Sequence, residues 1–189
     1  MSWKPRLRDR EMRLLRGQLR MLAGRTALLE MDRYLQHGDT TCLWHSVAVA
    51  YTSLWLARRL GLRCRLRSLL IGALLHDYFL YDWHRYDPVR GPFHGFAHPG
   101  RALANAARDY PLDVVEREII ARHMFPLTPA PPCCREAALV CLADKLCSVL
   151  EVVSRDPYAG LRGRCADALT VRSARGGGTV KTRAAAGRR

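Results

Sequence analysis

Lysine and long apolar runs are both scarce in this chain of 189 residues. It contains three lysines against 28 arginines. Its longest apolar stretches, 69–75 and 137–143, are far shorter than the about 20 residues that a helix needs to cross a bilayer. The basic first residues are not followed by the apolar segment of a signal peptide. The sequence therefore argues against a membrane-spanning protein and predicts a cytoplasmic one.

Paired cysteine motifs are also missing. The seven cysteines are an odd number, and their spacings form no CxxC pairs of the kind that hold structural zinc. Cys141 and Cys147 lie within apolar helical sequence, where a reduced thiol behaves as a small hydrophobic side chain. This pattern is typical of a reduced intracellular protein rather than a disulfide framework.

Positive charge is concentrated at the two ends of the chain. Of the net charge of +14, residues 1–33 contribute +5, residues 156–189 contribute +6 and the long middle part only +3. A basic end can bind nucleic acid. The alternative explanation of the basic ends is that the whole protein uses arginine in preference to lysine, without a role in binding. The lysine count favours this alternative, so nucleic acid is not the partner that we expect.

Apolar periodicity predicts an all-α protein. Steps of three and four residues favour helices over 10–34, 42–60, 64–77, 99–110, 112–123 and 136–153. Proline and glycine favour loops over 82–97 and 125–135, and no stretch has the alternation of a strand. We therefore expect a basic N-terminal helix over 1–34, one helical domain over 35–155, and a disordered basic tail over 156–189.

Two acidic residues follow runs that are built to be buried. Asp77 comes after the apolar run 69–75 and His76, and Asp144 comes directly after the run 137–143. A buried ionised carboxylate costs several kcal/mol unless it is paired or binds a metal. A metal would explain both acids, and imidazole with carboxylate favours iron, manganese, zinc or magnesium.

The neighbouring positions of His76 and Asp77 leave two arrangements open. Side chains of adjacent helical residues point about 100° apart, so one metal lies between them or Asp77 reaches a second metal. Other histidines could join them: His45 within an apolar helix, His98 and His123 at helix ends, and His94 in a loop. Each of these alone is ordinarily a core, loop or solvent-facing histidine.

Taken in order, these residues resemble the HD-domain superfamily of metal-dependent phosphohydrolases. The segments that carry the resemblance span about 35–153, and within that superfamily they are similar to a group of uncharacterised bacterial proteins. They read "QHGDTTCLWHSVAVAY", "GALLHDYFLYDWH", "FHGFAHPGRALANA", "RHMFPLT" and "VCLADKLCSVLE". The resemblance implies a helical bundle with a metal site in its core.

The resemblance also implies roles for individual residues. His45, His76, Asp77 and Asp144 match the first metal site of the family, and Asp77 matches the carboxylate that bridges to a second ion. His98 and His123 match the additional ligands of the two-metal branch. Two divalent ions are therefore expected. His94 has no counterpart in this comparison, and we expect it to contact phosphate from its loop.

The implied activity is hydrolysis of a phosphate ester or anhydride in a small phosphorylated substrate, with a nucleotide expected. His76 and Asp77 would be the catalytic pair. Metal ions lower the pKa of water, so no separate protein base is required. Arg101, Arg122 and Lys145 are candidate cations for the phosphoryl group. The alternative is a non-catalytic nucleotide sensor or nucleic-acid-binding protein on the same fold.

Overall fold

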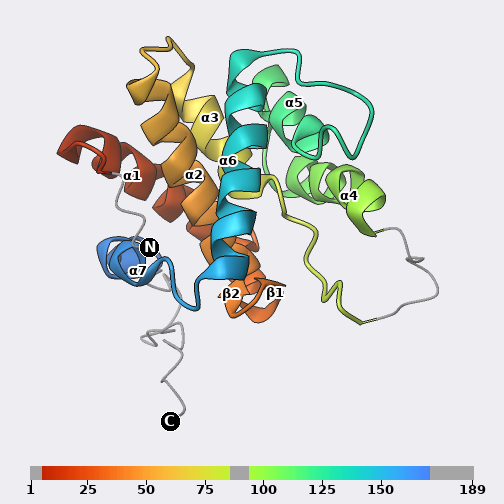
Figure 1. Ribbon diagram of the computed structural model, residues 1–189, viewed down its shortest axis with the longest axis horizontal. Coiled ribbons are helices and arrows are strands. Elements are labelled where there is room, and N and C mark those ends of the chain that lie inside the picture. Colours follow the sequence, from red (N-terminus) through yellow and green to blue (C-terminus); the bar gives the residue numbers. More distant parts are fainter. Residues whose placement is uncertain (1–5, 86–93, 171–189) are drawn as a thin grey trace.

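The computed structural model describes residues 6–85 and 94–170, and these form a bundle of helices with one very short hairpin (Figure 1). The all-α prediction is confirmed. The elements are α1 (Asp9–Arg25), a 3-10 helix (Leu28–Arg33), β1 (Leu35–His37), β2 (Thr40–Thr41), α2 (Cys42–Arg59), α3 (Leu66–Leu75), α4 (His94–Asp109), α5 (Val114–Arg122), α6 (Arg135–Val153), α7 (Ala159–Cys165) and a second 3-10 helix (Ala166–Ala168).

The centre of the bundle is built by α2, α3, α5 and α6. In Figure 1, α6 runs along the front of the molecule, with α2 on one side and α5 on the other. Gly72 allows α3 to approach α5 closely, because a Cβ atom at this position would lie 2.6 Å from Ile119 Cδ1. None of the described helices is both long enough and apolar enough to span a membrane.

Several predicted helix ends agree with the structure. Thr41 caps α2, and its hydroxyl accepts a hydrogen bond from the backbone N–H of Trp44 at 3.4 Å. Gly61 follows the same helix with a positive φ of 63°, the left-handed conformation that glycine adopts without strain. The last long helix, α6, begins within one residue of the predicted start.

The N-terminal helix is shorter than predicted, and a hairpin follows it. α1 ends at Arg25 rather than 34, and the chain then forms the first 3-10 helix. The strands β1 and β2 pair antiparallel where no strand was predicted, and Gly38 turns the chain between them with a φ of 55°. Strands of three and two residues are too short to show an alternating pattern.

Residues 94–97, predicted as loop, form the first turn of α4. Pro99 therefore lies inside the helix instead of opening it. The missing N–H of Pro99 would have bonded to the carbonyl of Gly95, so the helix continues with one hydrogen bond fewer. Of the rest of the predicted loop, residues 82–85 form no helix, as predicted, and residues 86–93 lie outside the described residues.

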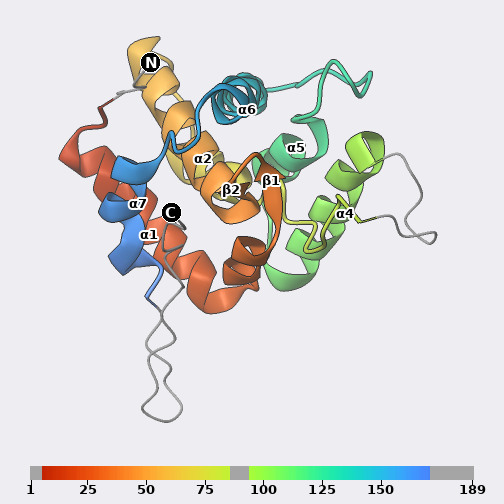
Figure 2. The same cartoon turned by 60° about the horizontal axis from the view of Figure 1, so that its bottom comes forward.

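The prediction of a disordered tail from residue 156 is wrong as far as residue 170. α7 and the 3-10 helix after it lie beside α1 in both Figure 1 and Figure 2. Cys165, Ala168 and Leu169 are buried there, and Asp167 forms an ion pair with Arg16. With Tyr158 and Leu161, these residues lie at three- and four-residue steps, a helical pattern that the prediction of a disordered tail overlooked. Residues 171–189 lie outside the described part of the chain.

Candidate metal centre

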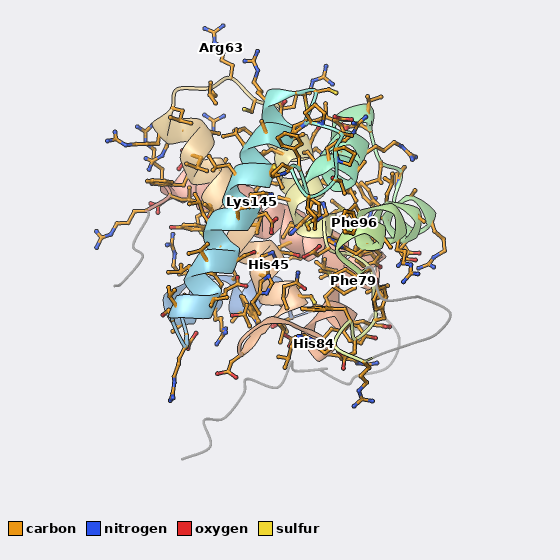
Figure 3. All side chains as sticks on the ribbon, turned by 45° about the vertical axis from the view of Figure 1, so that its right-hand side comes forward. His45, Arg63, Phe79, His84, Phe96 and Lys145 are labelled. Carbon is orange, nitrogen blue, oxygen red and sulfur yellow. The ribbon has the colours of Figure 1, made fainter. Side chains whose placement is uncertain are left out.

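The six side chains predicted as ligands converge on one buried place in the bundle. They come from α2, the ends of α3 and α5, α4 and α6. All six are nearly inaccessible to solvent; they are His45, His76, Asp77, His98, His123 and Asp144. Figure 3 shows His45 in the interior, near the stretch of α6 that carries Lys145. The fold therefore unites residues that are up to 99 positions apart in sequence.

Two of the histidines are oriented by the same local device. His76 directly follows α3 and His123 directly follows α5. In each, Nδ1 lies close to the carbonyl oxygen three residues earlier, 2.8 Å from Ala73 O and 2.9 Å from Ile120 O. Because a carbonyl only accepts, Nδ1 carries the proton in both rings. The lone pair of each ring is thus on Nε2, which faces the cluster.

One group of donor atoms surrounds Asp144. Its Oδ1 lies 3.1 Å from His45 Nε2 and 3.8 Å from His76 Nε2. Asp77 Oδ2 joins this group, at 3.4 Å from His76 Nε2 and 3.7 Å from His45 Nε2. His45, His76 and Asp144 have the mutual spacing of ligands around one ion. We refer to these residues, with Asp77 Oδ2, as the first donor group.

A second donor group lies on the other side of Asp77. Asp77 Oδ1 is 3.3 Å from His98 Nε2 and 3.5 Å from His123 Nε2. The two histidine Nε2 atoms are 2.9 Å apart. Asp77 therefore directs one carboxylate oxygen to each group, which is the arrangement of a bridging ligand.

Two buried atoms of the cluster lack a hydrogen-bond partner in the described part of the chain. They are His76 Nε2, in the first donor group, and Asp77 Oδ1, in the second. A buried polar atom without a partner costs about 1–3 kcal/mol. When His76 is neutral, both atoms present a lone pair to neighbouring donor atoms, so a divalent cation in each group would satisfy both.

The buried carboxylates of the cluster also require positive charge nearby. Burial would raise the pKa of Asp77, but His76, His123 and His98 hold it well below its ordinary value. Burial likewise opposes ionisation of Asp144, yet His45 and His76 lower its pKa. Burial lowers the pKa of His76, but Asp77 and Asp144 outweigh burial and raise that pKa to about 9. In the metal-free protein, the protons on these histidines therefore balance the negative charge of the carboxylates, as metal ions would in the metal-bound protein.

Two polar side chains around the ligands were not predicted from the sequence. Glu151 contacts His45 Nδ1 through both carboxylate oxygens, at 2.9 and 3.0 Å. Gln36 donates from Nε2 to Asp77 Oδ2 at 2.7 Å. Glu151 had a sequence signal, because it follows Asp144 by seven residues and so lies on the same face of α6. Gln36 had none, since its position depends on the unpredicted hairpin.

The predicted substrate-binding cations are already engaged with neighbouring groups. Lys145 Nζ donates to the carbonyl of His123 at 3.0 Å and lies 3.9 Å from Asp144 Oδ2, at the edge of the first donor group. Arg101 lies over the ring of Tyr81 and donates to its hydroxyl at 3.4 Å. Arg122 Nε faces Glu118 Oε2, one turn earlier on α5, at 3.6 Å. Lys145 therefore contacts two of the predicted ligands.

Two segments next to predicted ligands, one before His98 and one after His123, lie against each other. A Cβ atom on Gly95, in the first turn of α4, would lie 3.0 Å from Leu127 Cδ2 in the loop after His123. Phe96 and Leu127 are both exposed apolar side chains, and Figure 3 shows Phe96 on the α4 side of the molecule. The side chain of His94, predicted as a phosphate contact, lies outside what the structure describes.

Comparison with known proteins gives one finding. A family model, that of the HD domain, matches residues 43–148, which include all six residues of the cluster. No curated protein and no solved structure matches the chain.

Proposed function

The chain belongs to the HD-domain family, and on that premise we propose that it is a metal-dependent phosphohydrolase whose substrate is a nucleotide. It would cleave a phosphate ester or anhydride with the help of two divalent ions. The observation that carries the proposal is the position of Asp77. Its Oδ2 lies near the Nε2 atoms of His45 and His76 and its Oδ1 near those of His98 and His123, and Oδ1 has no hydrogen-bond partner within the described chain.

The donor atoms limit the choice of ion. Both groups consist of imidazole nitrogen and carboxylate oxygen, a set that suits iron, manganese, zinc or magnesium. His45, His76 and Asp144 would hold one ion, His98 and His123 the other, and Asp77 would bridge them. When bound, such a pair of ions polarises phosphoryl oxygens and lowers the pKa of water.

The chain itself orients the reacting groups. Gln36 fixes the carboxylate plane of Asp77 through its hydrogen bond to Oδ2, so that Oδ1 turns toward His98 and His123. The carbonyls of Ala73 and Ile120 fix the proton of His76 and His123 on Nδ1 and keep both Nε2 atoms available. Rigid positioning of this kind lowers the reorganisation needed during the reaction.

Cationic side chains supply further electrostatic support. Lys145 stands beside Asp144 and is partly exposed, so its ammonium group lies between the buried cluster and solvent. A phosphate that approaches the cluster would meet this charge. Arg101 lies on α4, the helix that carries His98, and its guanidinium contacts the ring and hydroxyl of Tyr81. Lys145 is therefore the cation that we expect to contact substrate.

Metal analysis combined with a nucleotide panel tests the proposal. We expect purified protein to contain a divalent transition metal or to bind Mn²⁺ tightly, and to hydrolyse one or more members of a panel of nucleoside phosphates, dinucleoside polyphosphates and cyclic dinucleotides, with the products separated by chromatography. A matched control is His84→Ala, because His84 is an exposed histidine that pairs with Asp82 away from the cluster. Bound metal without turnover on any member would favour the alternative of a nucleotide sensor.

A further inference from the structure

Glu151 is a buried carboxylate that the proposed reaction does not use. It lies on α6 two helical turns after Asp144 and is only 3% exposed. Its two oxygens lie 2.9 and 3.0 Å from Nδ1 of His45, which is completely buried. A carboxylate in such a place costs several kcal/mol unless its lone pairs are satisfied. Its partners therefore explain why an acid is present there.

Tyr158 provides the second hydrogen bond to Glu151. The hydroxyl of Tyr158 donates to Glu151 Oε1 at 2.8 Å, and this ring is 3% exposed. Burial, together with the neighbouring Cys147 and Glu151, raises the pKa of Tyr158, so the phenol stays protonated and remains a donor. The result is a continuous buried chain from Tyr158 through Glu151 to His45.

The chain of hydrogen bonds fixes the tautomer of His45. An ionised carboxylate only accepts, so Nδ1 of His45 must carry the proton. The lone pair of the neutral ring is then on Nε2, which lies 3.1 Å from Asp144 Oδ1 in the first donor group. A carboxylate behind a ligand histidine holds the ring in place and increases the basicity of the ligating nitrogen.

We infer that Glu151 is a positioning residue for the metal ligand His45, and that Tyr158 holds Glu151 in place for this role. Both residues follow the matched HD-domain region, which ends at 148. The segment that leads into α7 thus completes the first donor group from outside that region. This inference rests on the proposed function, because it assumes that His45 binds a divalent ion.

A purely structural role for Glu151 would have different consequences. Glu151 also links α6 to α2, so its loss could lower stability without any effect on metal. Glu136 offers a matched control. It is a buried carboxylate near the start of α6, 6% exposed, and accepts a hydrogen bond from the backbone N–H of Arg65 at 2.8 Å. It contacts neither donor group.

The experiment titrates Mn²⁺ into metal-stripped full-length protein by calorimetry and compares Glu151→Gln, Tyr158→Phe and Glu136→Gln with wild type. We expect Glu151→Gln to weaken the first Mn²⁺ by about 10- to 100-fold, with a smaller loss in Tyr158→Phe. Binding at the second donor group should be retained, and Glu136→Gln should bind as wild type does even if its melting temperature falls. Because Tyr158→Phe removes only one hydroxyl, it carries the test if Glu151→Gln does not fold.

A second readout reports on the proton itself. In wild type loaded with diamagnetic Zn²⁺, nitrogen-15 spectra of the histidines should show His45 protonated on Nδ1, and this signal should shift or broaden in Glu151→Gln. Wild-type Mn²⁺ affinity in both Glu151→Gln and Tyr158→Phe would overturn the inference while leaving the proposed function intact. Wild-type protein that binds no divalent metal would overturn both.

Discussion

The Nε2 atoms of His98 and His123 lie 2.9 Å apart, although the two residues come from different helices. Since His123 donates from Nδ1 to the carbonyl of Ile120, its Nε2 is an acceptor that faces another imidazole nitrogen. One proton can bridge two such nitrogens. A cation shared with Asp77 Oδ1, at 3.3 and 3.5 Å from the two rings, would use all three lone pairs.

The bridging position of Asp77 predicts unequal effects of ligand substitutions. We expect Asp77→Ala to strip both ions and to abolish phosphohydrolysis, because each donor group loses a carboxylate oxygen. His98→Ala and His123→Ala should weaken mainly the second ion, and Asp144→Ala mainly the first. Metal stoichiometry of the purified variants measures these losses.

A histidine outside the cluster provides the control for that series. His84→Ala should keep the wild-type metal content, since His84 is partly exposed and pairs with Asp82. Full activity in Asp77→Ala, in protein without tightly bound metal, would contradict the enzyme hypothesis.

The second prediction is that metal binding releases a proton from His76. In the metal-free protein the pKa of His76 is raised to about 9, mainly because Asp77 and Asp144 outweigh the effect of burial. A raised pKa means that the folded metal-free protein holds this proton at pH 7 and loses it as the pH rises through about 9. A metal must displace the proton, so metal affinity should increase from pH 7 to pH 9.

Calorimetry in two buffers of different ionisation enthalpy measures this release. At pH 7 the apparent binding enthalpy of Mn²⁺ should depend on the buffer, and the dependence should diminish toward pH 9. An enthalpy independent of buffer at pH 7 would mean that His76 is already neutral in the metal-free protein.

Close packing of α3 against α5 carries the third prediction. A Cβ atom on Gly72 would lie 2.6–2.9 Å from atoms of Ile119, so Gly72→Ala should destabilise the protein by about 1–3 kcal/mol. These two helices end at His76 and His123, so metal binding should weaken as well. Denaturant unfolding with and without Mn²⁺ measures both effects.

Gly17 in α1 is the matched control for Gly72. Apart from the backbone of α1 itself and the adjacent residues, no atom of the described chain lies within 4 Å of a Cβ placed there, so Gly17→Ala should stabilise the helix by about 0.5–1 kcal/mol. Equal effects of the two substitutions would show that helix propensity rather than close packing governs position 72.

The sequence was most informative where buried runs end in polar residues. The runs before Asp77 and Asp144 predicted a buried cation site, and the order of histidines around them predicted which side chains meet. The residues that support the ligands were harder to find. Gln36 reaches Asp77 only because a hairpin of two very short strands places it there, and tertiary packing alone determines that contact. Tyr158 begins a short series of apolar residues at helical spacing that the prediction of a disordered tail overlooked, and its contact with Glu151 depends on tertiary packing.

The C-terminal segment provides the last prediction, which corrects an expectation from the sequence. Ending the chain after residue 155 removes buried Tyr158, Cys165 and Leu169 and uncovers the parts of α1 and α6 that this segment contacts. Burying a large apolar side chain contributes about 1.5–3 kcal/mol, so we expect a loss of about 3 kcal/mol or more. That loss corresponds to a fall of roughly 6–12 °C in melting temperature.

Ending the chain after residue 170 removes sequence without apolar periodicity and should change the melting temperature little. Thermal unfolding of the two truncated proteins tests this difference, and equal melting temperatures would show that α7 contributes nothing to the fold. The shorter protein should also bind its first Mn²⁺ more weakly, because it lacks the hydroxyl that hydrogen-bonds Glu151.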